Sequence, residues 1–127
     1  MRVLLDTQLI FWWLADPERL PRHARETVER ATHAYVSHAS LWEMAIKVSI
    51  GKMAVDIDRF EQQVTRDGFA WLPIERPHLL AVASLEAFED HRDPFDRLLV
   101  AQSRLEPLIL LTTDGKLARY GATVRVL

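Results

Sequence analysis

Arg2-Val3-Leu4-Leu5-Asp6, at the start of the chain, is a short apolar run that ends at a carboxylate. A second apolar run, Leu108-Ile109-Leu110-Leu111, is followed by Thr112-Thr113-Asp114. Strands that are apolar on both faces are typical of parallel sheets covered by helices on both sides. The two runs therefore predict buried strands of an α/β fold.

Strand-like and helix-like segments alternate along the rest of the chain. Further strands are predicted over 34–36, 69–74 and 123–127. Apolar spacing, together with proline and glycine punctuation, predicts helices over 9–14, 21–31, 41–49, 57–67, 79–87 and 93–105. This order predicts a three-layer α/β/α sandwich with a mostly parallel central sheet of four to five strands, in one domain spanning 1–127.

Composition narrows the function classes. The 127 residues are 49% hydrophobic and include no cysteine, which excludes a disulfide scaffold, a thiolate zinc site and a cysteine nucleophile. The longest apolar run, Leu9 to Ala15, is far shorter than the roughly 20 residues of a membrane span, and no signal-peptide pattern precedes it. We expect a cytoplasmic protein. A net charge of −2 gives no support to a duplex-DNA binder.

Four acidic residues are predicted to lie near one edge of the sheet. Ligands of such folds bind outside the carboxyl ends of the strands, and these acids fall there: Asp6, Glu43, Asp96 and Asp114. Carboxylate oxygens suit Mg²⁺ or Mn²⁺. Carboxylates held close together repel one another unless a cation neutralises them, so one shared site for one or two divalent ions explains the pattern.

Each acid also has a structural interpretation. Glu43 could complete a capping box with Ser40, or pair with Lys47 four residues later. Asp96 could complement the helix dipole, and Asp114 could cap a turn. Asp93, directly before a proline, is either a fifth ligand or a helix N-cap.

Other polar and aromatic side chains carry weaker signals. Arg97 could reach a phosphate or form an ion pair. His91 has no partner at ligand spacing, which favours a structural role. The four tryptophans are expected in the core rather than as base-stacking platforms: Trp12, Trp13, Trp42 and Trp71.

Four segments resemble the motifs of the PIN-domain ribonucleases, and most closely those of VapC-type toxins of toxin–antitoxin pairs. The segments, in chain order, are Leu4-Leu5-Asp6-Thr7, the run VSHASLWEMAIK at 36–47, the run HRDPFDRLLVAQ at 91–102, and Leu111-Thr112-Thr113-Asp114. The resemblance covers essentially the whole chain, and the third motif is highly specific. Two mild departures are Gln8, where histidine is expected, and Ser103, where alanine is usual.

The resemblance implies a metal-dependent endoribonuclease. Asp6, Glu43, Asp96 and Asp114 would hold one or two Mg²⁺ (or Mn²⁺) ions. The residues that would support them are Ser40, Arg97, Thr112 and, if it is more than a cap, Asp93. The implied partners are RNA as substrate, a small VapB-like antitoxin, a second copy of the chain, and DNA only indirectly through the antitoxin.

Three other classes of protein compete with this interpretation of the sequence. A phosphorelay receiver domain would need an adjacent acidic pair after the first strand, and a haloacid-dehalogenase-like phosphatase would need a second aspartate where Gln8 stands. A catalytically inactive PIN-like binding module is the strongest alternative, because motifs alone do not prove turnover.

Overall fold

A computed structural model describes all residues, 1–127. Its centre is one sheet in which every neighbouring pair of strands is parallel. The strands, in chain order, are β1 (Arg2–Leu5), β2 (His33–Ser37), β3 (Ala70–Leu72), β4 (Ile109–Thr112) and β5 (Val124–Val126). Their order across the sheet is β3-β2-β1-β4-β5. The predicted parallel sheet is thus confirmed, with five strands.

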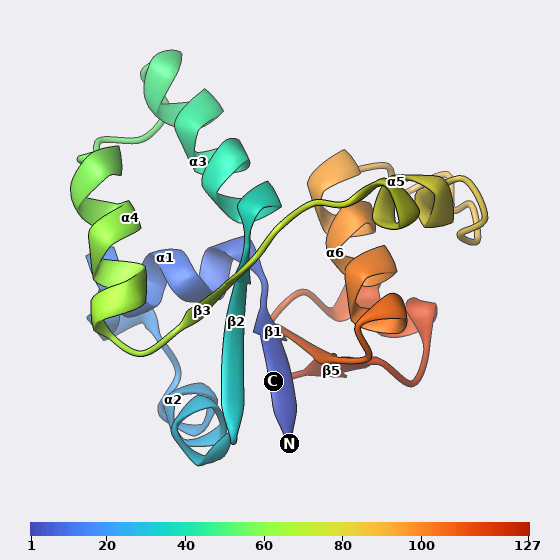
Figure 1. The fold of residues 1–127 in the computed structure, drawn as a ribbon, viewed down its shortest axis with the longest axis horizontal. Coiled ribbons are helices and arrows are strands. Elements are labelled where there is room, and N and C mark those ends of the chain that lie inside the picture. The colour runs from blue at the N-terminus through green and yellow to red at the C-terminus, as the bar shows by residue number, and fades with distance from the viewer.

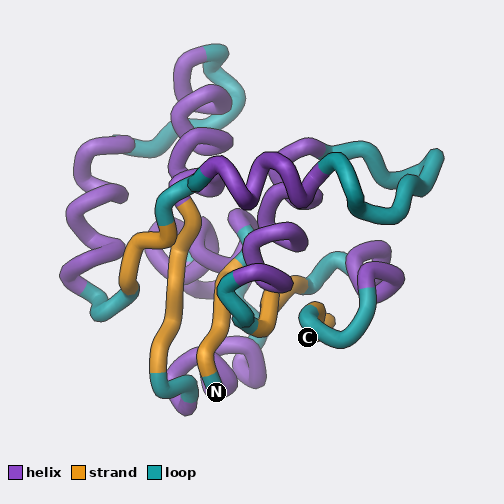
Figure 2. The backbone as a smooth tube through the Cα atoms, turned by 45° about the vertical axis from the view of Figure 1, so that its right-hand side comes forward, coloured by secondary structure: helices purple, strands orange, loops and turns teal.

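Helices cover both faces of this sheet (Figure 1). The α-helices are α1 (Thr7–Ala15), α2 (Arg22–Arg30), α3 (His38–Ser49), α4 (Ile57–Arg66), α5 (Arg76–Val82) and α6 (Pro94–Leu105). Two 3₁₀-helices are η1 (Pro17–Arg19) and η2 (Gly115–Tyr120). Figure 2 shows the strands side by side between these layers. No helix is long and apolar enough to cross a bilayer.

Two separate hydrophobic clusters confirm the three-layer arrangement. Val3 and Leu5 of β1 pack with α1, α2 and α4 on one face, whereas Leu4, between them, packs with α6 and η2 on the other. Successive side chains of a strand point to opposite faces, so an unbroken apolar run supplies both cores. This is why the strand sequences lack the polar alternation of a half-exposed sheet.

The connection between β3 and β4 creates a switch point in the sheet. From β1 the chain moves outward through β2 to β3, and then returns to the opposite side of β1 to form β4. Leu5 pairs with Leu111, so β1 and β4 end side by side. The backbone N–H of Asp6 donates to the carbonyl of Leu111 at 3.0 Å. The residues after these two strands are therefore neighbours, and such a switch point at the carboxyl ends of the strands is where open α/β sheets bind their ligands.

Several predicted boundaries are wrong. The third strand ends at Leu72 rather than residue 74, because Pro73 has no N–H for the ladder. Helix α5 ends at Val82 and does not include Ala83 or Ala87. The backbone N–H groups of residues 83–85 each donate to the carbonyl three residues earlier, which is the 3₁₀ pattern rather than the α-helical one. Its Leu80 is 67% exposed instead of facing the core.

The prediction that Trp42 lies in the core is also wrong. Helix α3 turns Ala39, Ser40 and Met44 inward, and Trp42 lies on a different side of that helix. Its side chain is 55% exposed, and its ring packs edge-on against the ring of Phe95, with 4.9 Å between the ring centroids. The other three tryptophans are half-buried.

Candidate active site

Asp6 sits at the end of β1 and begins α1. One oxygen, Oδ1, accepts a hydrogen bond from the Leu9 N–H at 3.0 Å, which makes Asp6 the N-cap of α1. The other, Oδ2, accepts from the hydroxyl of Thr112. Asp6 is only 5% exposed. Its carboxylate is thus buried and held at both oxygens.

Asp114 follows β4 and is linked to Asp6 through Thr112. The backbone N–H of Asp114 donates to Thr112 Oγ1 at 3.0 Å, while that hydroxyl donates to Asp6. The Asp114 side chain caps η2 by accepting from the Lys116 N–H at 3.0 Å. Thr112, the last residue of β4, therefore ties the two strand-end acids together.

Glu43 projects from α3, and the predicted capping box is wrong. Ser37, at the end of β2, is the N-cap of α3 and accepts from the Ala39 N–H at 2.9 Å. The predicted pairing of Glu43 with Lys47 is confirmed, since Oε2 lies 3.1 Å from the lysine Nζ. The other oxygen, Oε1, is buried and has no hydrogen-bond partner.

Ser40 lies inside α3 rather than at its start. Its buried hydroxyl accepts from Thr7 Oγ1 at 2.9 Å. Thr7 directly follows Asp6 and is the first residue of α1. Ser40 thus makes no hydrogen bond to an acid, and joins the starts of α1 and α3 instead.

Asp93 and Asp96 lie at the start of α6. Asp93 caps this helix by accepting from the Asp96 N–H at 2.9 Å, as an aspartate directly before a proline predicts. The Asp96 carboxylate points elsewhere: its Oδ2 lies 3.3 Å from His91 Nε2. Asp96 is part-buried, whereas Asp93 is exposed.

The electrostatics of the site reflect crowding of like charges. Burial raises the pKa of Asp6, even though its bonds from Thr112 and Leu9 oppose this, and the charges of Glu43 and Asp114 add to it. The pKa of Asp96 is raised to about 7, first by burial and then by the charges of the other acids, Asp93, Asp6, Glu43 and Asp114. The four predicted acids therefore lie near enough to oppose one another's ionisation.

These residues fit a divalent cation. Ligand atoms of His91, Asp96 and Asp114 lie within 4.8 Å of one another. Asp6 and Glu43 are outside this tightest group but raise the pKa of Asp96 by their charge. Glu43 Oε1 is a buried oxygen with no donor, and an unpaired buried carboxylate oxygen is costly. A hard cation would satisfy that oxygen and offset the repulsion among the acids.

His91 and Tyr120 are site residues that the sequence analysis did not find. His91 is buried, and it contacts both Asp96 and the hydroxyl of Tyr120, which lies 2.9 Å from Nδ1. The loop between α5 and α6 (at the right of Figure 2) carries His91, and η2 carries Tyr120. No spacing rule within one helix could link them. The specific motif that includes His91 was the available signal.

The guanidinium of Arg97 is held by hydrogen bonds to two oxygens rather than by an ion pair. Its Nη1 donates to the Glu86 carbonyl at 2.8 Å and to the Tyr120 hydroxyl at 3.0 Å. A pocket beside it is lined by Ala87, Phe88, Glu89, His91, Arg92 and Arg97. The guanidinium is therefore anchored between the loop and η2.

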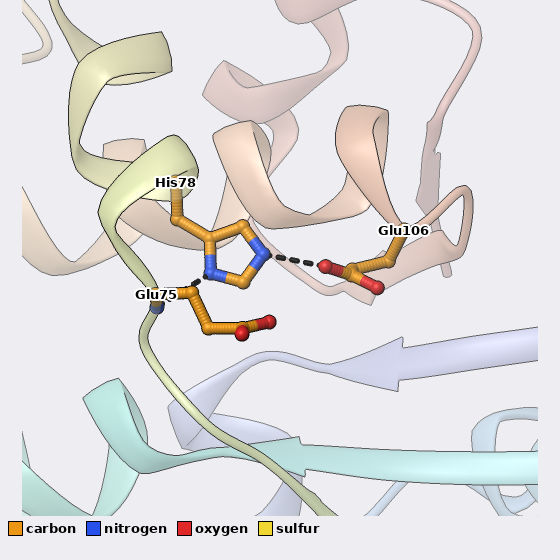
Figure 3. Close-up of side chains that lie close together, drawn as sticks. All are labelled: Glu75, His78 and Glu106. Atoms are coloured by element: carbon orange, nitrogen blue, oxygen red, sulfur yellow. Dashed lines mark hydrogen bonds and ion pairs between the residues drawn. The ribbon is translucent and has the colours of Figure 1, made fainter.

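A second cluster, Glu75, His78 and Glu106, lies apart from these acids (Figure 3). His78 Nδ1 accepts from the Glu75 backbone N–H at 3.0 Å, so the proton of the neutral ring is on Nε2. Nε2 lies 2.6 Å from Glu106 Oε2 and donates to it. Both ring nitrogens are thus engaged, and His78 has no lone pair left for a metal. This cluster fastens α5 to the end of α6.

Comparison with known proteins agrees with this architecture. A family model described as the PIN domain matches residues 3–122. A curated relative, Ribonuclease VapC22 of Mycobacterium tuberculosis (strain ATCC 25618 / H37Rv), is 29% identical over 120 residues, which are 93% of this chain and 91% of that protein.

Solved structures share the fold at lower identity. VapBC2 from Rickettsia felis, bound to a DNA fragment from its promoter, matches with a TM-score of 0.70 and 13% identity, covering 100% of this chain and 98% of that one. FitAcB from Neisseria gonorrhoeae matches with a TM-score of 0.70 and 17% identity, covering 96% and 95%. The parallel sheet, the acids at its edge and the family match over residues 3–122 lead to one assignment: the chain belongs to the PIN domain family.

Proposed function

We propose that this protein is a Mg²⁺- or Mn²⁺-dependent endoribonuclease and the toxin of a toxin–antitoxin pair. The observation that carries the proposal is the gathering of Asp6, Glu43, Asp96 and Asp114 at one sheet edge, with a buried Glu43 oxygen that has no partner. A relative that is named a ribonuclease covers most of the chain, which supports RNA as the substrate.

The four acids would hold one or two divalent ions. The chemistry that such ions supply when bound is polarisation of a phosphoryl oxygen and activation of a water. Thr112 and the Leu9 N–H keep the two oxygens of Asp6 in a fixed orientation, so this carboxylate needs little reorganisation. Attack of water in line with the leaving oxygen would break the P–O3′ bond and leave a 5′-phosphate and a 3′-hydroxyl.

Cations near the acids would bind the RNA backbone. Lys47 and Lys116 flank Glu43 and Asp114, and Arg92 lies exposed beside His91 without an ion pair. Their charges attract phosphates toward a site whose own acids would repel them. Arg97, fixed by Tyr120 and Glu86, would support the start of α6.

The partners follow from the same proposal. Solved toxin–antitoxin complexes contain this fold, so we propose that a VapB-like antitoxin binds the chain in the cytoplasm and blocks access to the acids. The chain would contact DNA only indirectly, through this antitoxin. Exposed apolar side chains, those of Trp42 and Ile46 on α3 and of Ile50 directly after it, lie on or beside the helix that carries Glu43. A second copy of the chain completes the proposed assembly, which sedimentation of the purified toxin would test.

RNA cleavage by the purified, antitoxin-free protein tests the proposal. We expect cleavage of a structured RNA pool with Mg²⁺ or Mn²⁺, none with EDTA, and a loss of at least about 100-fold in Asp6→Asn, since losing a ligand exceeds the cost of losing an outer partner. Asparagine is also a good N-cap, so α1 should still form and melting should stay cooperative.

Other outcomes would redirect the proposal. Product ends with 2′,3′-cyclic phosphate would contradict attack by water. Divalent binding without cleavage would indicate a narrow RNA target. The absence of both cleavage and divalent binding would favour an inactive PIN-like binding module.

A further inference from the structure

We propose that His91 is a positioning residue: a hydrogen-bond relay from Arg97 through Tyr120 and His91 fixes the carboxylate of Asp96. This inference rests on the proposed metal site, because it assigns His91 to the orientation of one of the expected ligands. It does not make His91 a ligand itself.

The relay joins three separate segments. Arg97 Nη1 lies 3.0 Å from the Tyr120 hydroxyl, that hydroxyl lies 2.9 Å from His91 Nδ1, and His91 Nε2 lies 3.3 Å from Asp96 Oδ2. His91 and Tyr120 are 6% and 3% exposed. Because water hardly reaches these two side chains, they must satisfy each other's hydrogen bonds.

The chemistry of the donors sets the direction of the relay. A guanidinium can only donate, so Arg97 occupies a lone pair of the tyrosine oxygen. The tyrosine hydrogen is then available to His91 Nδ1. With Nδ1 as acceptor, the ring proton lies on Nε2, which donates to Asp96 Oδ2.

This bond leaves one Asp96 oxygen for a cation. Asp96 Oδ1 makes no hydrogen bond within the chain, while Oδ2 is held by His91. Asp96 lies in the first turn of α6 and is half-buried. Its side chain has two rotatable bonds, so it could adopt other orientations if no partner held it. Outer partners that hold a ligand in this way orient it and tune its affinity for the metal.

Arg97 and Tyr120 are themselves anchored. Arg97 also donates to the Glu86 carbonyl at 2.8 Å. The Tyr120 ring packs edge-on against the rings of Phe88 and His91, with centroid distances of 5.2 Å and 5.5 Å. The relay therefore starts from a rigid support, so that the position of Asp96 is set by the loop and η2 as well as by α6.

The tautomer of His91 tests the relay directly. In the metal-free protein at neutral pH, nitrogen NMR should show a proton on Nε2 and none on Nδ1. A proton on Nδ1 with none on Nε2 would overturn the proposal, because Nε2 would then offer a lone pair rather than a donor. This measurement needs neither cleavage nor bound metal, so it stands apart from the test of the nuclease itself.

Mn²⁺ binding measured by calorimetry tests the consequence. His91→Leu and Tyr120→Phe should each weaken Mn²⁺ binding about 10- to 100-fold. His91→Gln, whose amide N–H can reach Asp96, should recover most of that loss. The matched control is His23→Gln, a change on α2 at a histidine whose side chain makes no hydrogen bond, and it should bind like the wild type.

Three results would overturn the inference. The first is unchanged Mn²⁺ binding in a cooperatively folded His91→Leu variant. The second is loss of binding in His91→Leu with none in Tyr120→Phe, which would make His91 a ligand; Zn²⁺ affinity would then fall more than Mg²⁺ affinity. The third is failure of His91→Gln to recover binding.

Discussion

Several acids of the candidate site also have a structural role, because they cap helices. Asp6, Asp93 and Asp114 each cap a helix with one carboxylate oxygen. The capping interpretation is therefore correct for Asp93 and Asp114, and Asp6 is a further cap that was not predicted; a cap does not compete with a role in the site. A carboxylate has two oxygens, and a cap uses one. The second oxygen of Asp6 accepts a hydrogen bond from the Thr112 hydroxyl, and this bond links the ends of β1 and β4.

Asp96→Asn should stabilise the metal-free protein at neutral pH. The pKa of Asp96 is raised from 3.8 to about 7 in the folded chain. Between these values the folded state holds a proton that the unfolded state has lost, so the stability from this group is present below about pH 4 and is lost as the pH rises through about 7. Asparagine carries no charge and avoids this loss.

Thermal melting in EDTA measures the effect. A gain of about 1 kcal/mol corresponds to roughly 4 °C for a chain of this length, and the gain should exceed that at pH 8. The gap between variant and wild type should close as the pH falls toward about 4. Added Mn²⁺ should raise the melting temperature of the wild type only. If the melting temperatures of the variant and the wild type differ by the same amount at every pH, the pKa of Asp96 is not raised in the folded protein.

At the scale of elements, the start of α6 separates capping from metal binding. Asparagine caps a helix about as well as aspartate, so Asp93→Asn should change the free energy of unfolding by less than about 0.5 kcal/mol. Asp93 is exposed and its charge raises the pKa of Asp96. We therefore expect Asp93→Asn to keep Mn²⁺ binding and RNA cleavage and to lower the pKa of Asp96.

Asp93→Ala is the matched control for that prediction. It removes the cap and should cost about 1 kcal/mol of stability. Calorimetry and cleavage of RNA should then show no greater loss than in Asp93→Asn. If Asp93→Asn loses Mn²⁺ binding as completely as Asp96→Asn does, Asp93 is a ligand and the assignment as a cap alone fails.

Local signals in the sequence predicted most elements but not every cap. Asp93-Pro94 marks the true start of α6, and α4 ends just before Gly68, whose φ of 90° suits glycine. The start of α3 was misplaced because Ser37 and Ser40 are both good caps. Only the end of β2, which depends on its pairing with β1 and β3, selects Ser37.

The contacts around Asp96 could not be predicted in the same way. His91, Asp96 and Tyr120 come from a loop, a helix and η2, and only the packed fold brings them together. The acids themselves were easier to place, because Asp6 and Asp114 come just after strands of a parallel sheet, and Glu43 and Asp96 lie in helices whose positions the sequence indicates. Sheet topology fixes where strands end, whereas it says little about how a loop folds back.

At the scale of the whole molecule, the switch point explains why the acids meet. β1 and β4 lie side by side although about a hundred residues separate them, so Asp6 and Asp114 become neighbours. Helix α3 follows β2 and carries Glu43 near its middle, and helix α6 follows the loop after α5 and carries Asp96 in its first turn. The site is thus assembled by connectivity, and the raised pKa values of Asp6 and Asp96 reflect that assembly.

The same molecule must attract a polyanion to an acidic site, which predicts that RNA binding is sensitive to salt. Its net charge is −2, so attraction has to come from local cations such as Lys47, Lys116 and Arg92. If two phosphates of a single strand are neutralised, the log–log slope of binding against salt is about −1.4, and raising salt from about 50 to about 200 mM should lower kcat/KM roughly sevenfold. The loss should appear in KM rather than in kcat.

Arg92→Gln should flatten that slope, because it removes a cation that makes no ion pair and whose loss leaves no buried partner unpaired. The matched control is Arg66→Gln on α4, an exposed arginine in the last turn of a helix that packs on the face opposite α6. Cleavage is measured at fixed Mg²⁺ across the salt series. A kcat/KM that does not fall with salt would mean that RNA is recognised without its phosphates, while equal slopes for Arg92→Gln and the wild type would remove Arg92 from the RNA path and leave the two lysines.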